Sequence, residues 1–132
     1  SIFYKVTEED SEKIFNTIKT INLEKKKNLI AKQLSHGEKQ WLEIGMLLMQ
    51  QTDLLLIDEP VAGMTEKETK NTSVLLKKIS KERTVLVVEH DMHFVESLNV
   101  EIVVLHEGRV LTRGKMNTIK KNQQVIDVYL GR

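Results

Sequence analysis

The sequence contains no cysteine and only one proline among its 132 residues. Without cysteine the chain cannot form a disulfide, a zinc–thiolate site or a cysteine nucleophile, and this composition suits a cytosolic protein. The formal net charge is +1, whereas a DNA-binding domain usually has a stronger basic bias, so we expect no nucleic-acid partner. No uncharged apolar run approaches the roughly 20 residues that span a bilayer, so any membrane association should be peripheral.

A glycine-rich phosphate-binding loop is also absent from the sequence. Such a loop reads G-x-x-x-x-G-K-[ST], and none of the six glycines begins a match. The nearest segment, GRVLTRGKM over residues 108–116, has one residue too many between its glycines, and Met116 replaces the hydroxyl residue that would bind Mg²⁺. It also lies where we expect a hairpin rather than a strand followed by a helix, so we reject it.

Apolar periodicity and capping residues predict an α/β chain with a helical part ahead of its first core strand. The two core strands are short apolar runs, which favours strands that are buried on both faces, as in a parallel sheet. We expect residues 1–5 to be extended, strands over 54–57 and 84–88, and a hairpin of 101–105 and 109–112. We expect helices over 7–21, from Ser35–Gly37 to about 49, over 65–81 and over 92–98, with short helical pieces in 28–34 and 117–130.

Two adjacent carboxylates, Asp58 and Glu59, follow the first core strand directly. Buried acids without a partner are strongly disfavoured, and ligands of open α/β sheets collect at the carboxyl ends of the strands. An apolar run that ends in Asp-Glu is the pattern of a Walker B motif. In such a motif Asp58 would hold Mg²⁺ and Glu59 would polarise the water that attacks a γ-phosphate. Pro60 cannot donate a ladder hydrogen bond and should end the strand.

A histidine, His90, closes the second core strand in the same way. If the two strands are neighbours, His90 lies beside Asp58 and Glu59, where it can donate to a phosphate oxygen. A metal site of these three residues without a nucleotide is an alternative, but it lacks the local ligand spacing of zinc sites. Glu89 is interpreted as a structural partner of His90. The other histidines are interpreted as structural or surface residues: His36, His93 and His106.

The segment LSHGE, residues 34–38, begins the second long helix. Ser35 is a good N-cap residue, and Gly37 would let a backbone N–H approach a ligand closely. A helix N-terminus with these groups can bind an anion. An ordinary capped helix is the alternative interpretation, and the position of this segment ahead of Asp58 and Glu59 favours the anion site.

Taken together, LSHGE, LLLIDEP and VVEHD resemble the signature motif, Walker B motif and switch histidine of ABC-transporter ATPase subunits. The resemblance extends over essentially the whole chain. EPVAGM, EHDM, VLHEGRVLTRG and YLGR resemble the branched-chain amino acid and urea importers, and KQWLEIGMLLMQ with YLGR is most similar to the urea importers. Two positions depart from the family: His36 stands where glycine is commonest, and Thr65 stands where many members have aspartate. Thr65 is better explained as the N-cap of the next helix.

The resemblance implies roles for the motif residues. Asp58 would serve Mg²⁺, Glu59 would be the catalytic base, and His90 would sense the γ-phosphate. Residues 60–64 would form a loop between two subunits. The residues that would contact ATP bound to the opposite subunit are Ser35, His36, Gly37, Glu38, Ala62 and Gly63.

The resemblance also implies ATP and Mg²⁺ as cofactors, a second ATP-binding subunit in a head-to-tail dimer, and permease subunits in a cell membrane, on whose inner face the protein would lie. Residues 1–50 would be the remainder of a helical subdomain, and residues 51–132 the C-terminal part of the ATPase core. The phosphate-binding loop, Q-loop and adenine-stacking aromatic are expected before Ser1. We therefore predict that this polypeptide alone neither binds ATP tightly nor hydrolyses it, and that exposed apolar sheet surface makes it self-associate.

Two other functions remain open. A non-transport ABC ATPase is one, although such proteins usually carry two cassettes or long insertions. The other is a half-cassette that acts as an interaction or dimerisation module and completes the site of another subunit.

Overall fold

A computed structural model describes residues 5–130 in two compact units, one ending at His90 and the other beginning at Asp91. The predicted extended structure of residues 1–4 and the last two residues of the YLGR motif lie outside the described residues. The expected division into residues 1–50 and 51–132 concerns a longer ATPase and stays a prediction. None of the helices described between residues 5 and 130 is long and apolar enough to cross a membrane.

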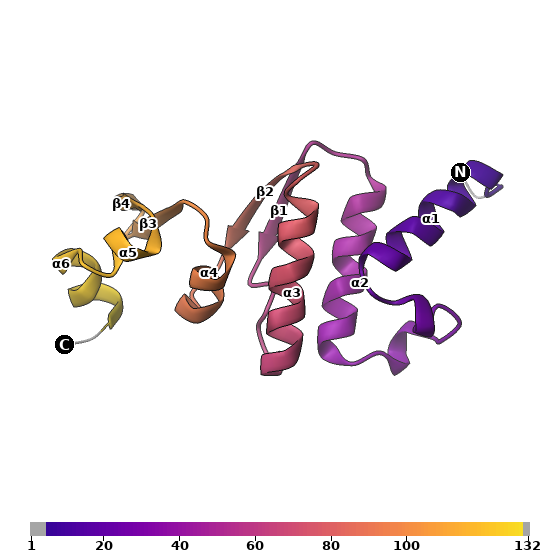
Figure 1. The fold of residues 1–132 in the computed structure, drawn as a ribbon, viewed down its shortest axis with the longest axis horizontal. Coiled ribbons are helices and arrows are strands. Elements are labelled where there is room, and N and C mark those ends of the chain that lie inside the picture. The colour runs from indigo at the N-terminus through magenta and orange to yellow at the C-terminus, as the bar shows by residue number, and fades with distance from the viewer. Residues whose placement is uncertain (1–4, 131–132) are drawn as a thin grey trace. The chain divides into compact units, whose positions relative to one another are not determined.

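The first unit has the predicted order of helices and strands (Figure 1). Two helices connected by two 3-10 turns come first, and a strand, a third longer helix and a second strand follow. The elements are α1 (Glu8–Thr20), η1 (Glu24–Lys26), η2 (Ala31–Gln33), α2 (His36–Met49), β1 (Leu54–Asp58), α3 (Glu66–Ile79) and β2 (Thr84–Val88).

Each of the three longer helices begins with a capping box. In this arrangement the N-cap hydroxyl accepts a hydrogen bond from the third helical N–H, and the carboxylate at that third position accepts one from the N-cap N–H. Two of these boxes, those of α1 and α3, were predicted as such from the sequence, and the N-cap of α2 was also predicted. The pairs are Thr7 with Asp10, Ser35 with Glu38, and Thr65 with Glu68.

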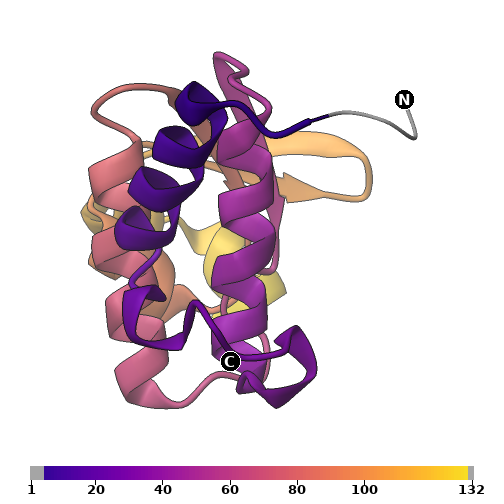
Figure 2. The same cartoon turned by 90° about the vertical axis from the view of Figure 1, so that its right-hand side faces the viewer.

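Strands β1 and β2 are parallel neighbours, and their register pairs Leu54 with Thr84 and Asp58 with Val88. The predicted burial of both faces is wrong. Leu55 is 3% exposed, whereas Leu56 is 63% exposed, so only alternate residues of β1 are covered. Within the first unit, helices cover a single side of this sheet, and Figures 1 and 2 show α3 lying along it.

The uncovered side of the sheet is an open apolar surface. Parallel sheets are normally covered on both faces, so this surface is unusual for such a sheet. The predicted exposure of apolar residues on the sheet is confirmed. Four large side chains form this surface, here called the open sheet face: Leu54, Leu56, Leu86 and Val88.

A buried hydrogen bond joins α2 to α3. The indole Nε1 of Trp41 donates to the hydroxyl of Thr72 at 2.9 Å, and that hydroxyl donates to the backbone carbonyl of Glu68 at 2.8 Å. Trp41 and Thr72 are both buried.

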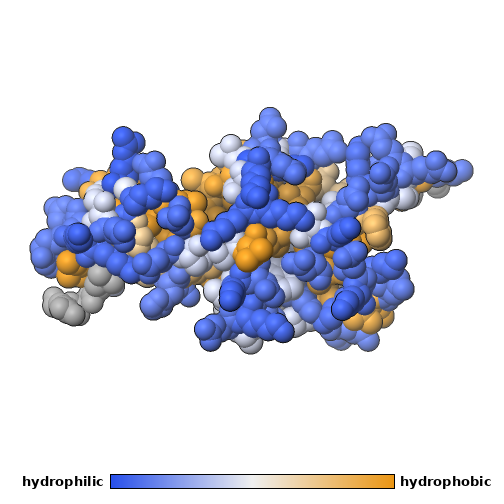
Figure 3. Space-filling view, in the orientation of Figure 1, coloured by the Kyte–Doolittle hydropathy of each residue, from blue (hydrophilic) through white to orange (hydrophobic). Residues whose placement is uncertain are grey.

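Around α2 and α3, hydrophilic side chains predominate on the face shown in Figure 3, with small hydrophobic patches between them.

The second unit contains the predicted hairpin. Its two antiparallel strands are joined by Glu107 and Gly108, both with positive φ, as a tight two-residue turn requires. The rejected GRVLTRGKM segment begins in this turn and runs along the second strand. The elements are α4 (Met92–Leu98), β3 (Ile102–His106), β4 (Arg109–Gly114), α5 (Met116–Ile119), α6 (Gln123–Val125) and the π-helical η3 (Ile126–Leu130).

Candidate functional site

The two adjacent acids lie at the carboxyl end of β1. Asp58 is the last strand residue and is exposed. The backbone N–H of Glu59 still donates to the Val88 carbonyl at 2.9 Å, and the chain then turns with Glu59 at a φ of 45°. A left-handed conformation at a non-glycine residue is uncommon and frequent near functional sites. Pro60 follows and is fully buried, which anchors the turn.

His90 lies beside Glu59, as predicted from the ends of the two strands. Its Nδ1 is 3.2 Å from Oε1 of Glu59, and the two side chains are 75% and 53% exposed. The Glu89 side chain is buried, and its Oε2 accepts a hydrogen bond from the His90 backbone N–H at 2.7 Å. Glu89 therefore orients the backbone, while the side chains of His90 and Glu59 contact one another and are largely exposed.

The signature segment, residues 34–38, is the second cluster. The Ser35 hydroxyl accepts from the Glu38 N–H at 3.2 Å, and the Ser35 N–H donates to Oε2 of Glu38 at 2.9 Å. The ammonium of Lys26 lies 2.5 Å from the other oxygen of Glu38. The hydrogen bond from Lys26, followed by that from the Ser35 backbone, holds the pKa of Glu38 below its usual value. This carboxylate thus secures the first turn of α2.

A residue of α3, Glu68, also reaches the signature segment. Its Oε1 accepts from the Ser35 hydroxyl at 2.9 Å, and its Oε2 accepts from the Thr65 N–H and hydroxyl at 3.0 and 2.8 Å. The Thr65 N–H, then the Thr65 and Ser35 hydroxyls, lower the pKa of Glu68. The sequence marked Glu68 only as a capping residue, because its contact with Ser35 spans 33 positions and leaves no local pattern.

The loop of residues 60–64 lies against the signature segment of the same chain. The Nε2 of His36 is 3.0 Å from the carbonyl oxygen of Ala62, within hydrogen-bonding distance. Gly63 has a φ of 68°, and a Cβ there would touch the His36 ring at 3.5 Å. His36, interpreted from the sequence as a structural or surface residue, is therefore an exposed residue that contacts this loop.

Gly37 leaves room for the Glu68 carboxylate. A Cβ at Gly37 would lie 2.7 Å from Cδ of Glu68, closer than real Cβ contacts come. The glycine was predicted to let a ligand approach, and the structure adds that it lets Glu68 approach. The predicted site residues thus form two groups, one with Asp58, Glu59 and His90, and one with residues 35–38, Ala62 and Gly63.

Within residues 5–130 no group of three or more histidine or acidic side chains is arranged to hold a metal ion. Magnesium needs no such cage, because it is commonly held by one or two carboxylates together with phosphates and water. The exposed Asp58 carboxylate, with Glu59 beside it, is a donor set of that kind.

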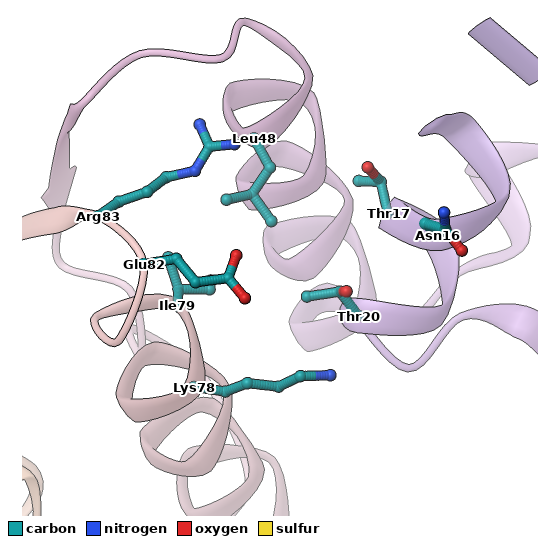
Figure 4. Close-up of a pocket in the computed structure, with 8 residues that line it drawn as sticks. All are labelled: Asn16, Thr17, Thr20, Leu48, Lys78, Ile79, Glu82 and Arg83. Carbon is teal, nitrogen blue, oxygen red and sulfur yellow. The ribbon is translucent and has the colours of Figure 1, made fainter. Parts of the chain in front are cut away.

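A depression in the first unit is lined by none of the predicted site residues. Figure 4 shows it between α1, the end of α2 and the end of α3, with Leu48 among its lining residues. Leu48 is about 18 Å along α2 from His36, at 1.5 Å per residue, so this depression is not part of the candidate site.

Comparison with known proteins agrees with the motifs. A family model described as ABC transporter matches residues 3–62. The branched-chain amino acid transport ATP-binding protein BraF of Pseudomonas aeruginosa is 36% identical over 131 residues, which are 98% of this chain and 51% of BraF. LivG of Escherichia coli K12, of the same description, is 32% identical over 131 residues, with the same two coverages of 98% and 51%.

The fold agrees as well. The crystal structure of the ADP conformation of an ATP-binding cassette of an ABC transporter superposes with a TM-score of 0.87 and 24% identity, covering 100% of this chain and 54% of that one. The predicted class, α/β with parallel core strands flanked by helices and a C-terminal hairpin, is confirmed. The chain is similar to ATP-binding proteins of ABC transporters, by the family model over residues 3–62 and by the curated relatives over 98% of its length. It spans about half the length of the curated relatives it matches.

Proposed function

We propose that this chain forms part of the ATP-binding subunit of an ABC importer, which couples ATP hydrolysis to the uptake of a small polar solute. The observation that carries the proposal is the 3.2 Å approach of His90 to Glu59 at the carboxyl end of two parallel strands. The names of the relatives favour branched-chain amino acids as the solute. The segments KQWLEIGMLLMQ and YLGR favour urea.

The strand-end residues have distinct proposed roles. Asp58 holds Mg²⁺ through water, and that ion would neutralise charge on the phosphates of ATP. Glu59 accepts a proton from the attacking water, which requires an ionised carboxylate with access to solvent, and its side chain is 53% exposed. His90 donates a hydrogen bond from its ring to a γ-phosphate oxygen, and its contact with Glu59 keeps the two groups at one edge.

The second group of residues serves the opposite subunit of a head-to-tail dimer. The α2 N-terminus, with Ser35 as its cap, favours an anion through its free N–H groups and its dipole. Permease subunits would be the further partners, with this protein on the cytoplasmic side of the membrane. The residues proposed to contact ATP of the opposite subunit are Ser35, His36, Gly37, Glu38, Ala62 and Gly63.

A complementation assay tests the catalytic part. The chain is mixed with a fragment of an ATP-binding subunit that contains the G-x-x-x-x-G-K-[ST] loop, and ATP hydrolysis is measured with and without Mg²⁺. We expect activity only in the mixture, and Glu59→Gln should lower it by about 100-fold or more, because a general base contributes about 10² to 10⁴. Glu12→Gln, an exposed acid on α1, is the matched control. Full activity of Glu59→Gln, or hydrolysis by this chain alone, would contradict the proposal.

A second candidate function is an interaction module that completes the site of another subunit. It is favoured by the signature segment, which is already held by Lys26, Glu68 and Ala62 of this chain. In that case the chain should stimulate a full-length ATP-binding subunit whose own signature motif is disabled. The stimulation should be lost in Ser35→Ala and kept in Glu59→Gln, which is the opposite of the complementation result.

A further inference from the structure

The hydroxyl of Ser35 is engaged on both sides. It accepts a hydrogen bond from the Glu38 N–H at 3.2 Å, which caps α2. It also donates its single proton to Oε1 of Glu68 at 2.9 Å. A serine hydroxyl has no second proton to donate to another acceptor.

Glu68 can only accept in this contact. The hydrogen bonds from Thr65 and Ser35 keep its pKa low, so the group is an ionised carboxylate near neutral pH. A phosphate oxygen is likewise an acceptor, and it carries the same sign of charge. The Ser35 hydroxyl can therefore serve Glu68 or a phosphate, but it cannot donate to both at once.

We propose that Glu68 is a positioning residue for the signature segment, which holds the Ser35 hydroxyl until a phosphate oxygen takes its place. This inference rests on the proposed function, in which Ser35 contacts the phosphate of a nucleotide. The exchange frees only Oε1, because Oε2 stays with the N–H and hydroxyl of Thr65.

The exchange changes how α2 and α3 are joined. Before it, one carboxylate ties the N-termini of both helices together and lies against Gly37. After it, that tie is broken, while the Trp41–Thr72 hydrogen bond further along the helices remains.

Glu68→Gln separates the two roles of this carboxylate. Glutamine at the third helical position also completes a capping box, so α3 is preserved. The side-chain carbonyl oxygen of the glutamine accepts hydrogen bonds from the N–H and hydroxyl of Thr65. Its NH₂ group therefore faces Ser35. The amide then donates to the Ser35 hydroxyl, whose own proton becomes available to a phosphate.

The experiment titrates the full chain with inorganic phosphate and follows the backbone amides of Gly37 and Glu38 by NMR. We expect the dissociation constant to fall about fivefold in Glu68→Gln, because a charged competitor is removed and a donor is released. Glu66→Gln removes the same charge from an exposed position in the same turn of α3. This control should change the dissociation constant for phosphate less than twofold. In wild type, the Cδ resonance of Glu68 should shift with the same midpoint as the Gly37 amide.

A double-mutant cycle excludes a merely structural effect. In a Ser35→Ala background, Glu68→Gln should change the phosphate affinity no more than Glu66→Gln does, because the shared hydroxyl is absent. Equal effects of Glu66→Gln and Glu68→Gln in the wild-type background would overturn the inference. The absence of any phosphate-dependent shift in wild type and Glu68→Gln would also overturn it. Failure of the proposed function would instead be seen as a lack of ATP hydrolysis in the complementation and stimulation assays.

Discussion

The two groups of candidate site residues are held in contrasting ways. The signature segment is fixed from several directions by Lys26, Glu68 and Ala62, which belong to three different parts of the first unit. The strand-end group is supported mainly through its backbone. The His90 ring contacts Glu59 and lies 3.7 Å from Oε2 of Glu89, and the side chains of His90 and Glu59 are largely exposed.

This difference indicates which part of the site is preorganised. Groups that are held by hydrogen bonds need little further ordering to bind a ligand, and in the signature segment only the Ser35–Glu68 hydrogen bond would have to be exchanged. The strand-end group borders the open sheet face, and the side chains of His90 and Glu59 are 75% and 53% exposed. Changes to the α2–α3 junction, the buried pair of Trp41 and Thr72 that joins the two helices, should therefore lower the free energy of unfolding strongly. Changes at the strand ends should lower it little.

The largest effect is expected where the α2–α3 junction is broken outright. Trp41→Ala should lower the free energy of unfolding by about 3–5 kcal/mol, because a buried aromatic side chain is lost. Urea unfolding followed by circular dichroism measures this change. Met46→Ala, at an exposed position of the same helix, should change it by less than about 0.5 kcal/mol. Similar losses of stability in Trp41→Ala and Met46→Ala would contradict the special importance of the α2–α3 junction.

A smaller change at the same junction removes only a hydrogen bond. Thr72→Val keeps the side-chain shape but leaves the Trp41 Nε1–H buried without its acceptor, which should cost about 1–3 kcal/mol. The fluorescence of the single tryptophan during urea unfolding reports the loss. Thr72→Ser retains the hydroxyl and should lose clearly less stability than Thr72→Val. An unchanged Thr72→Val midpoint would show that this bond does not hold the junction.

The open sheet face should make the chain self-associate at high concentration. Combining Leu56→Lys with Leu86→Lys places two charges on that face and should weaken association about tenfold, with little loss of stability because both side chains are exposed. Sedimentation over a range of concentrations measures it. Val74→Lys, at an exposed apolar position of α3, is the control and should leave association unchanged. A monomeric wild-type chain at high concentration would refute the prediction.

Acid should loosen the signature segment. The pKa of Glu38 and that of Glu68 are lowered in the folded chain, so both carboxylates add stability above their unfolded value of 4.5. This contribution should fall as the pH drops below about 4.5 toward the folded pKa values. Urea midpoints at several pH values measure it, and Glu38→Gln with Glu68→Gln should flatten this part of the profile. An identical profile in that double variant would exclude these two groups as the cause.

The smallest effect is expected at the strand end. Asp58→Asn should change the free energy of unfolding by less than about 0.5 kcal/mol, because the side chain is exposed. The same variant should impair Mg²⁺-dependent hydrolysis in the complementation assay. A loss of several kcal/mol in the same urea measurement would mean that Asp58 is a structural residue and would remove the contrast between the two groups.

Much of the fold and part of the site were readable from the sequence because they depend on short-range patterns. The start of α3 follows from Thr65 and Glu68, three positions apart, and the hairpin turn follows from Glu107 and Gly108. The placement of Glu59 at the end of an apolar strand also predicted its approach to His90, since parallel neighbours end at the same edge.

Other features depended on tertiary structure alone. An apolar run such as that of β1 is equally consistent with burial on one face or two, and only the position of the helices shows that Leu56 is uncovered. The Ser35–Glu68 hydrogen bond joins residues 33 positions apart, and neither residue type reveals the other. Local hydrogen bonding is encoded by residues that are close in the chain. A contact between two helices exists only once their packing, here through Trp41 and Thr72, has brought them together.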